Sequence, residues 1–161
     1  MRLISEMGYG EKIIIVRLLP GEDVIEGIEA ACRKHGIKYG VITACFGSLK
    51  QIYFNYYFEP KDPINNPFGK DRDLILKKPC VFIAAQGLIC EEEDGKMDVH
   101  LHGLVRDNEG NNYSSHIPRG GNIVQYTVDV AIQVVSGMKL MRTFDEETQH
   151  LMTNPMPLVS E

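Results

Sequence analysis

The order of apolar and polar positions along the chain predicts one helix among several strands. The apolar run 13–19 ends at a Pro-Gly pair and is typical of a buried strand followed by a turn. In the segment 22–36, apolar side chains recur at helical spacing, with acidic residues at the start and basic residues at the end, as the helix dipole favours. Gly36 predicts the end of the helix. The next apolar run, 39–46, is predicted to end at Gly47-Ser48 and completes a strand–helix–strand unit.

Closely spaced strands are predicted for the rest of the chain, at 51–58, 80–90, 97–105, 112–117, 123–135 and 138–144. Gly87 is interpreted as the mark of a β-bulge. The Pro- and Asn-containing stretch 59–72 predicts a long loop, and the ends, 1–12 and 150–161, are predicted to be loosely held. The pattern therefore predicts a single domain over 1–161. Its class is α/β at the boundary with α+β, with a βαβ start and one main helix on a mostly antiparallel mixed sheet.

Composition narrows the range of functions. The chain of 161 residues carries a net charge of −5, which disfavours broad nucleic-acid binding, because such binding depends on Lys and Arg displacing counterions from phosphates. Its four cysteines lack a Cys-x-x-Cys spacing and are interpreted as buried free thiols in a reducing compartment. The first residues lack an apolar signal core, and the run at 13–16 is too short to span a membrane. We therefore expect a cytoplasmic protein.

Three of the five histidines fall on one predicted hairpin. In a strand over 97–105, His100 and His102 point to the same face, because successive side chains alternate. A three-residue turn at 108–110 places its final glycine where a left-handed conformation is needed. Counting outward from this turn puts His102 directly opposite His116 on the next strand, with His100 as the diagonal neighbour on the same face.

Histidines placed in this way are predicted to bind one metal ion. Imidazoles at opposite and diagonal positions converge on an ion about 2.0–2.1 Å from each nitrogen. Three neutral imidazoles suit Zn²⁺, and other divalent transition metals such as Fe²⁺, Ni²⁺ or Cu²⁺ are alternatives. Three protein ligands leave an open coordination position, which is typical of a catalytic or ligand-binding site. The alternative is that all three histidines are ordinary surface residues.

Motifs spread in order along 17–149 make the chain resemble a known family. They are Arg-Leu-Leu-Pro-Gly-Glu-Asp-Val at 17–24, Val-Ile-Thr-Ala-Cys-Phe-Gly-Ser-Leu at 41–49, His-Leu-His-Gly-Leu-Val-Arg-Asp at 100–107, Thr-Val-Asp-Val-Ala-Ile at 127–132 and Arg-Thr-Phe-Asp-Glu-Glu-Thr at 142–148. With these motifs the chain resembles the plants-and-prokaryotes conserved (PPC or PCC) domain in its stand-alone prokaryotic form. The resemblance implies a compact domain with a curved sheet, assembly into homotrimers, and a metal-ligand role for His116, here in a Ser-Ser-His-Ile context.

The family also carries a DNA-binding label. In plant members the domain follows an AT-hook, which inserts arginines into the minor groove of A·T-rich DNA. The nearest stretch here, Pro-Arg-Gly-Gly at 118–121, lacks the Arg-Gly-Arg-Pro core of such a hook. Together with the acidic balance, this leads us not to expect DNA binding by this chain alone.

Two functions stay open on the sequence. One is a metal-dependent enzyme or small-molecule binder, whose ligand carries adjacent oxygens, as in a hydroxy-keto acid. Arg142 or Arg106 would hold a carboxylate there and Glu92 would exchange a proton, although the favoured interpretation of each is an ordinary surface charge. The other is a DNA-associated or protein-interaction trimer in which the metal is structural. Aromatic residues at 53–58 would supply its interface or pack in the core.

Overall fold

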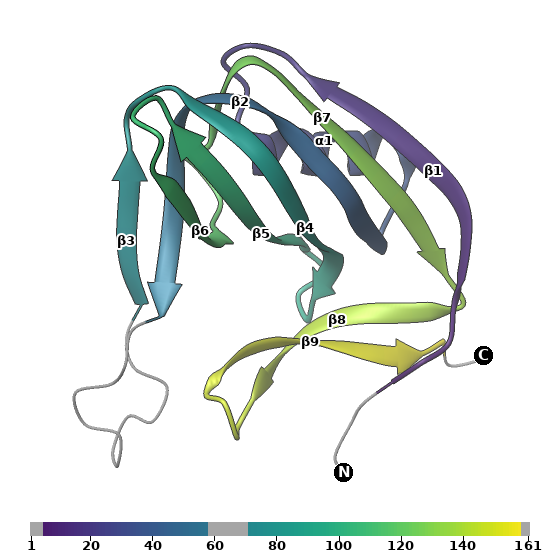
Figure 1. The fold of residues 1–161 in the computed structure, drawn as a ribbon. Helices are drawn as coiled ribbons and strands as arrows, with labels where there is room; N and C mark the ends of the chain where they lie inside the picture. Colours follow the sequence, from purple (N-terminus) through teal and green to yellow (C-terminus); the bar gives the residue numbers. More distant parts are fainter. Residues whose placement is uncertain (1–4, 58–70, 159–161) are drawn as a thin grey trace.

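The computed structural model describes residues 5–57 and 71–158. These residues form one helix and nine strands (Figure 1). In chain order the elements are β1 (Tyr9–Leu18), α1 (Val24–His35), β2 (Gly40–Tyr57), β3 (Asp71–Leu76), β4 (Cys80–Glu92), β5 (Met97–Asp107), β6 (Asn112–Ile117), β7 (Ile123–Ser136), β8 (Met138–Asp145) and β9 (His150–Pro157).

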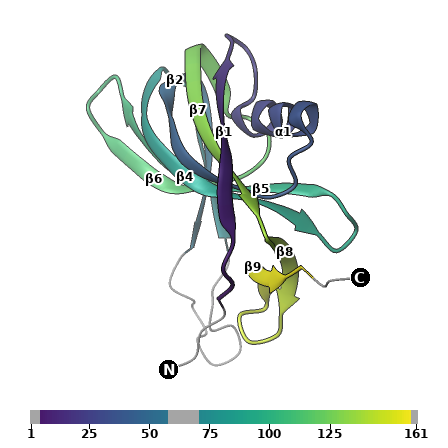
Figure 2. The ribbon, with the colours of Figure 1, turned by 90° about the vertical axis from the view of Figure 1, so that its right-hand side faces the viewer.

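The strands form a single mixed sheet that is strongly curved (Figures 1 and 2). Their order is β1-β7-β2-β6-β5-β4-β8-β9, with β3 paired to β2. Among the described strands, β4 and β8 form the parallel pair and the other pairings are antiparallel. Strands β1 and β2 both run antiparallel to β7, so they are parallel to each other with β7 between them. The predicted strand–helix–strand start is therefore confirmed, in a split form.

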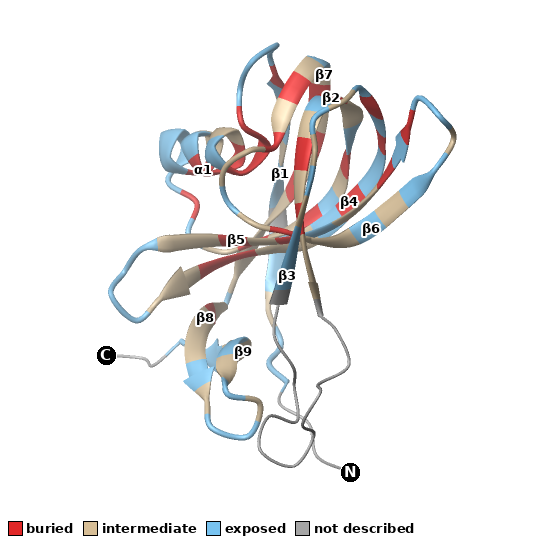
Figure 3. Ribbon diagram, turned by 90° about the vertical axis from the view of Figure 1, so that its left-hand side faces the viewer, coloured by how far each residue is buried: buried red, intermediate tan, exposed pale blue. Residues whose placement is uncertain are grey.

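Helix α1 covers one face of the sheet, and the core lies between them (Figures 2 and 3). The Asp23 carboxylate begins the helix by accepting hydrogen bonds from the backbone N–H groups of Ile25 and Glu26. Gly36 ends it in the left-handed conformation with φ of 64°, as predicted. At 12 residues, α1 is too short to cross a bilayer. The described residues contain no other helix that is long and apolar enough to do so.

The second strand differs from the sequence prediction. The runs 39–46 and 51–58 belong largely to one continuous strand, β2, and Gly47 does not end it. Gly47 has φ of +155°, and a Cβ there would lie 2.1 Å from the carbonyl oxygen of Thr127 on β7. The glycine thus lets two strands approach closely inside the sheet. The predicted loop at 59–72 lies mostly outside the described residues, apart from its last two residues, which begin β3.

The C-terminal end is also more ordered than the sequence suggests. The segment predicted to be loosely held from 150 onward contains β9, which pairs with β8 residue for residue from His150 opposite Asp145 to Pro157 opposite Met138. Its proline and polar residues are compatible with a strand because β9 lies at the edge of the sheet, where no further partner needs its N–H groups.

Candidate metal centre

The hairpin that carries the histidines has the register predicted from the sequence. His102 on β5 lies opposite His116 on β6, and Arg106 lies opposite Asn112. The turn between the strands contains Gly110 with φ of 91°. This confirms that strand alternation and turn length together decide which side chains face each other.

Asp107 holds the turn of this hairpin in place. Its buried carboxylate accepts hydrogen bonds from the backbone N–H groups of Glu109 at 2.9 Å and Asn111 at 2.8 Å, and pairs with Lys78 Nζ at 2.7 Å. The Tyr113 hydroxyl donates a further bond at 3.3 Å. Because the turn sets the pairing of β5 with β6, Asp107 also fixes the position of His116 opposite His102.

Protein stability will fall at acid pH through Asp107. Hydrogen bonding to Lys78, with smaller contributions from Asn111 and Glu109, holds the pKa of this carboxyl well below its usual range although desolvation opposes it. The unfolded pKa is about 3.9, so the stabilisation is present above about pH 5 and is lost as the pH falls toward the folded pKa. Urea unfolding of the wild type and Asp107→Asn from pH 7 to pH 3 should give a stability difference that narrows with falling pH. A constant difference would contradict this role.

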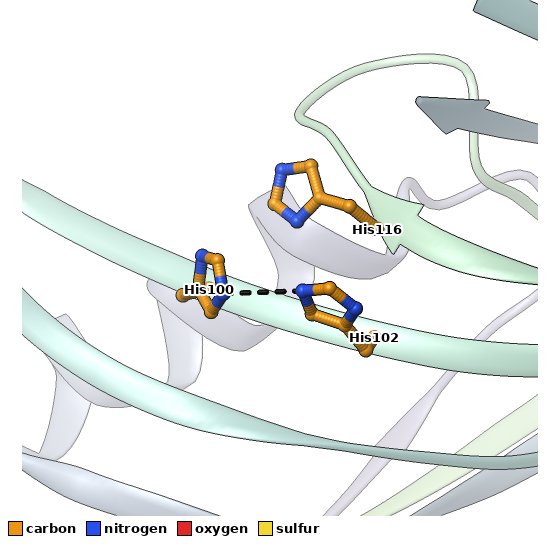
Figure 4. A group of neighbouring side chains, drawn as sticks. All are labelled: His100, His102 and His116. Atoms are coloured by element: carbon orange, nitrogen blue, oxygen red, sulfur yellow. Dashed lines mark hydrogen bonds between the residues drawn. The ribbon is translucent and has the colours of Figure 1, made fainter. Parts of the chain in front are cut away.

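The three imidazoles meet above β5 and β6 (Figure 4). The Nε2 atoms of His100 and His102 are 3.2 Å apart, and the potential ligand atoms of all three histidines lie within 4.8 Å of one another. Two nitrogens bound tetrahedrally to one Zn²⁺ are separated by about 3.3 Å, given zinc–nitrogen distances of about 2.0–2.1 Å. The His100–His102 spacing therefore already matches a shared metal ion.

The surroundings of His100 and His102 favour the uncharged imidazole. Burial, followed by the Arg142 charge and the other two imidazoles, lowers the pKa of His100 to about 4. Burial also lowers the pKa of His102. Nδ1 of His100 is buried and makes no hydrogen bond to the described residues. Neutral imidazoles keep a nitrogen lone pair for a metal, so the donor set fits a divalent transition ion.

Gly87 fixes the backbone behind His100. It lies on β4 opposite Leu101, and a Cβ there would be 2.1 Å from the carbonyl oxygen of His100. The β4–β5 register is regular at this point and shifts instead between Phe82 and Ala84. The prediction of a bulge at Gly87 is therefore wrong. Instead, the missing side chain allows β4 and β5 to approach each other closely beneath the histidine cluster.

The cluster forms one wall of a pocket of about 630 Å³, a size typical of small-molecule sites. The opposite wall comes from the β8–β9 hairpin, which contributes Arg142 and four consecutive residues beginning with His150. The remaining lining residues come from β2, β4 and the segment after β6, and they are Asn55, Leu88 and Pro118. His150 lies outside the predicted histidine hairpin in the sequence, but the fold brings it to the same pocket.

Of the three charged candidates, the structure brings Arg142 to the cluster. Its side chain is 15% exposed, and its Nε lies 3.0 Å from Oδ2 of Asp98, which precedes His100 by two residues. Arg106 is exposed and lies beside the hairpin turn, where its guanidinium is near Gly110. Glu92 lines a separate cavity of about 580 Å³ between α1 and the β4–β5 turn. Arg106 and Glu92 therefore lie outside the pocket of the histidines.

The pocket also contains residues that the sequence did not single out. Asn55 of β2 lies opposite His116. The backbone carbonyl of Asn55 accepts a hydrogen bond from the Ser115 hydroxyl at 2.5 Å. Thr153 of β9 lies within 3.5 Å of Arg142 and 3.6 Å of the Cys90 thiol. None of these side chains stands in a local motif, since they come together through pairings of distant strands.

The family of the chain follows from residues 5–136, which match the profile of the Plants and Prokaryotes Conserved (PCC) domain. The chain belongs to the PCC domain family. The matched part of this PCC protein runs through β7 and includes all three histidines. It ends before the β8–β9 hairpin, so the far wall of the pocket lies beyond the family match.

Known proteins similar to this PCC protein include curated relatives and solved structures. A curated relative, the bifunctional protein GlmU of Synechococcus sp. (strain JA-3-3Ab), is 25% identical over 140 residues, which are 87% of this chain and 20% of the relative. The chain thus spans about a fifth of the length of the curated relatives it matches.

Solved structures share the fold over nearly the whole chain. The metal-containing protein AF0104 from Archaeoglobus fulgidus has a TM-score of 0.77 at 22% identity, covering 95% of this chain and 99% of that one. A structure from Bacteroides thetaiotaomicron, described provisionally as a DNA-binding protein, has a TM-score of 0.74 at 14% identity, with coverages of 92% and 98%. At these identities the likeness concerns the fold.

Proposed function

We propose that this PCC protein binds a divalent transition metal, Zn²⁺ in the first instance, through His100, His102 and His116. The observation that carries the proposal is the convergence of the three ligand atoms within 4.8 Å on one wall of a pocket. The chemistry of three imidazole nitrogens suits Zn²⁺, Fe²⁺, Ni²⁺ or Cu²⁺. The metal-containing Archaeoglobus protein of the same fold supports the proposal.

The protein uses this site as a metal-dependent small-molecule binder or enzyme. Three protein ligands leave a coordination position open, and the cluster adjoins a pocket of about 630 Å³. When bound, such an ion polarises an oxygen atom of a ligand as a Lewis acid. The residues of the chain contribute the ordered imidazoles and a pocket that surrounds a small ligand.

Metal analysis of protein purified without a histidine tag tests the proposal. We expect roughly one ion per chain, as for a single three-histidine site. After removal by a chelator, adding back Zn²⁺ at about 100 times its Kd should stabilise the fold by about 2.7 kcal/mol, which raises the melting temperature by about 5–10 °C. Far less than one ion per chain, with no thermal shift for any of the four metals, would refute the site.

An exposed apolar surface favours a second candidate, a homotrimeric module for protein interaction or DNA association with a structural metal. Five apolar side chains alternate with core residues on the face of the sheet away from α1, and they are Ile13, Ile15, Phe46, Val81 and Ile83. Exposed apolar patches are typical of interfaces. Sedimentation equilibrium tests the trimer, and DNA titration at low salt tests the DNA association, because phosphate contacts are strongest there.

A further inference from the structure

The lining of the pocket beside the histidines contains a positive charge and no negative one. Arg142 is its permanently charged residue, and Asp98, just outside the lining, partly balances that charge. An ion held by three neutral imidazoles adds two positive charges to the same space. A pocket lined by one sign of charge concentrates ligands of the opposite sign, so its chemistry favours an anion.

Arg142 is positioned before any ligand arrives. Its Nε lies 3.0 Å from Oδ2 of Asp98 in an ion pair that lacks hydrogen-bond geometry, and its Nη1 donates toward Oγ1 of Thr153 at 3.5 Å. Among the described residues, no contact uses Nη2 of this guanidinium. A planar guanidinium that is already held in place loses little freedom when it binds a carboxylate with two parallel hydrogen bonds.

The spacing between Arg142 and the histidines limits the size of the ligand. Asp98 and His100 are two residues apart on β5, so they share a face and their Cα atoms are about 6.6 Å apart. Arg142 contacts Asp98 and lines the same pocket as the three imidazoles, so its guanidinium and the histidines face one space. A carboxylate whose neighbouring carbon carries a second oxygen is short enough to reach both groups.

Building on the metal site proposed above, we propose that the pocket binds a small 2-hydroxy or 2-oxo carboxylic acid. Arg142 binds the carboxylate, and the second oxygen faces the metal ligands His100, His102 and His116. Leu88 and Leu151 give the same pocket an apolar side, which accommodates a short hydrocarbon group of the ligand. Arg142 stands on β8, which follows the family match at 5–136, so the matched residues do not supply this contact to the ligand.

Titration of the Co²⁺-substituted protein with lactate and with neutral lactamide tests this proposal, because visible Co²⁺ absorption reports changes at the metal. We expect lactate to change the spectrum and to bind at least tenfold more tightly than lactamide. Arg142→Gln should weaken lactate binding at least tenfold, equivalent to about 1.4 kcal/mol, and leave lactamide binding unchanged. Arg142→Lys, which keeps the charge and loses the planar fork, should give an intermediate affinity.

Arg106→Gln is the matched control, since Arg106 is exposed and lies outside the pocket. Each variant is first measured for bound Co²⁺, so that a loss of the metal is separated from a loss of the anion. A wild-type protein that takes up no metal would refute the proposed function itself. Full metal uptake with equal affinities for lactate and lactamide, or with equal effects of the Arg142 and Arg106 variants, would overturn the ligand class alone.

Discussion

Replacing His102 with alanine will lower the metal affinity of the protein by roughly a hundredfold or more. The variant removes one of three ligands, and changes in groups that merely support a ligand already cost 10–100-fold. Because His102 is exposed, the stability of the metal-free protein should change by less than about 0.5 kcal/mol. Competition with a chelating dye measures the affinity, and urea unfolding of the metal-free protein measures the stability.

His35→Ala is the control for this experiment, since His35 is exposed at the end of α1 and does not line the pocket of the histidines. It should retain metal with the affinity of the wild type. The variants His100→Ala and His116→Ala should match His102→Ala in their loss of metal. A His102→Ala protein that keeps one ion per chain at wild-type affinity would show that the three imidazoles do not share an ion.

Gly87→Ala will destabilise the fold by about 3 kcal/mol and will also weaken metal binding. The added methyl group would lie 2.1 Å from the carbonyl oxygen of His100, so β4 and β5 must separate locally. For a chain of this size, the loss corresponds to a fall in melting temperature of about 6–12 °C. Thermal unfolding measures it, and the dye competition shows whether the displaced His100 still binds metal.

Gln86→Ala is the control for the stability of the glycine variant, because Gln86 is the preceding, exposed residue of the same strand. It should change stability by less than about 0.5 kcal/mol. Since Gln86 lies opposite His102, the wild type is the reference for metal affinity. A Gly87→Ala protein with the melting temperature of Gln86→Ala and the metal affinity of the wild type would mean that the two strands adjust to a side chain without cost. The close approach would then have no part in positioning His100.

The histidine hairpin could be predicted from the sequence because its determinants are local. Side-chain alternation assigned His100 and His102 to one face, and the length of the turn with Gly110 fixed the partner of His102 as His116. The helix was equally local, with an apolar stripe between the capping residues Asp23 and Gly36. In both cases, the deciding residues lie close together in the sequence, 16 positions apart for His100 and His116 and 13 for Asp23 and Gly36.

The far wall of the pocket could not be predicted in the same way. Arg142 and His150 reach the histidines only because β8 pairs with the end of β4 and β9 folds back on β8. The pattern of apolar residues in one sequence cannot predict that a strand near residue 140 pairs in parallel with another near residue 91. Gly47 and Gly87 were misread for a related reason, since a glycine needed for close approach looks in the sequence like one that ends or kinks a strand.

The two walls of the pocket are attached to the sheet very differently. Strand β5, which holds His100 and His102, is paired with β4 on one side and β6 on the other. The β8–β9 hairpin joins the rest of the sheet by two parallel residue pairs, Glu91 with Met141 and Glu92 with Arg142. A substitution in the hairpin can therefore alter the far wall of the pocket while the strands that carry the histidines keep their pairing. The family match covers the histidine wall and ends before the hairpin, so membership of the family does not by itself identify a ligand.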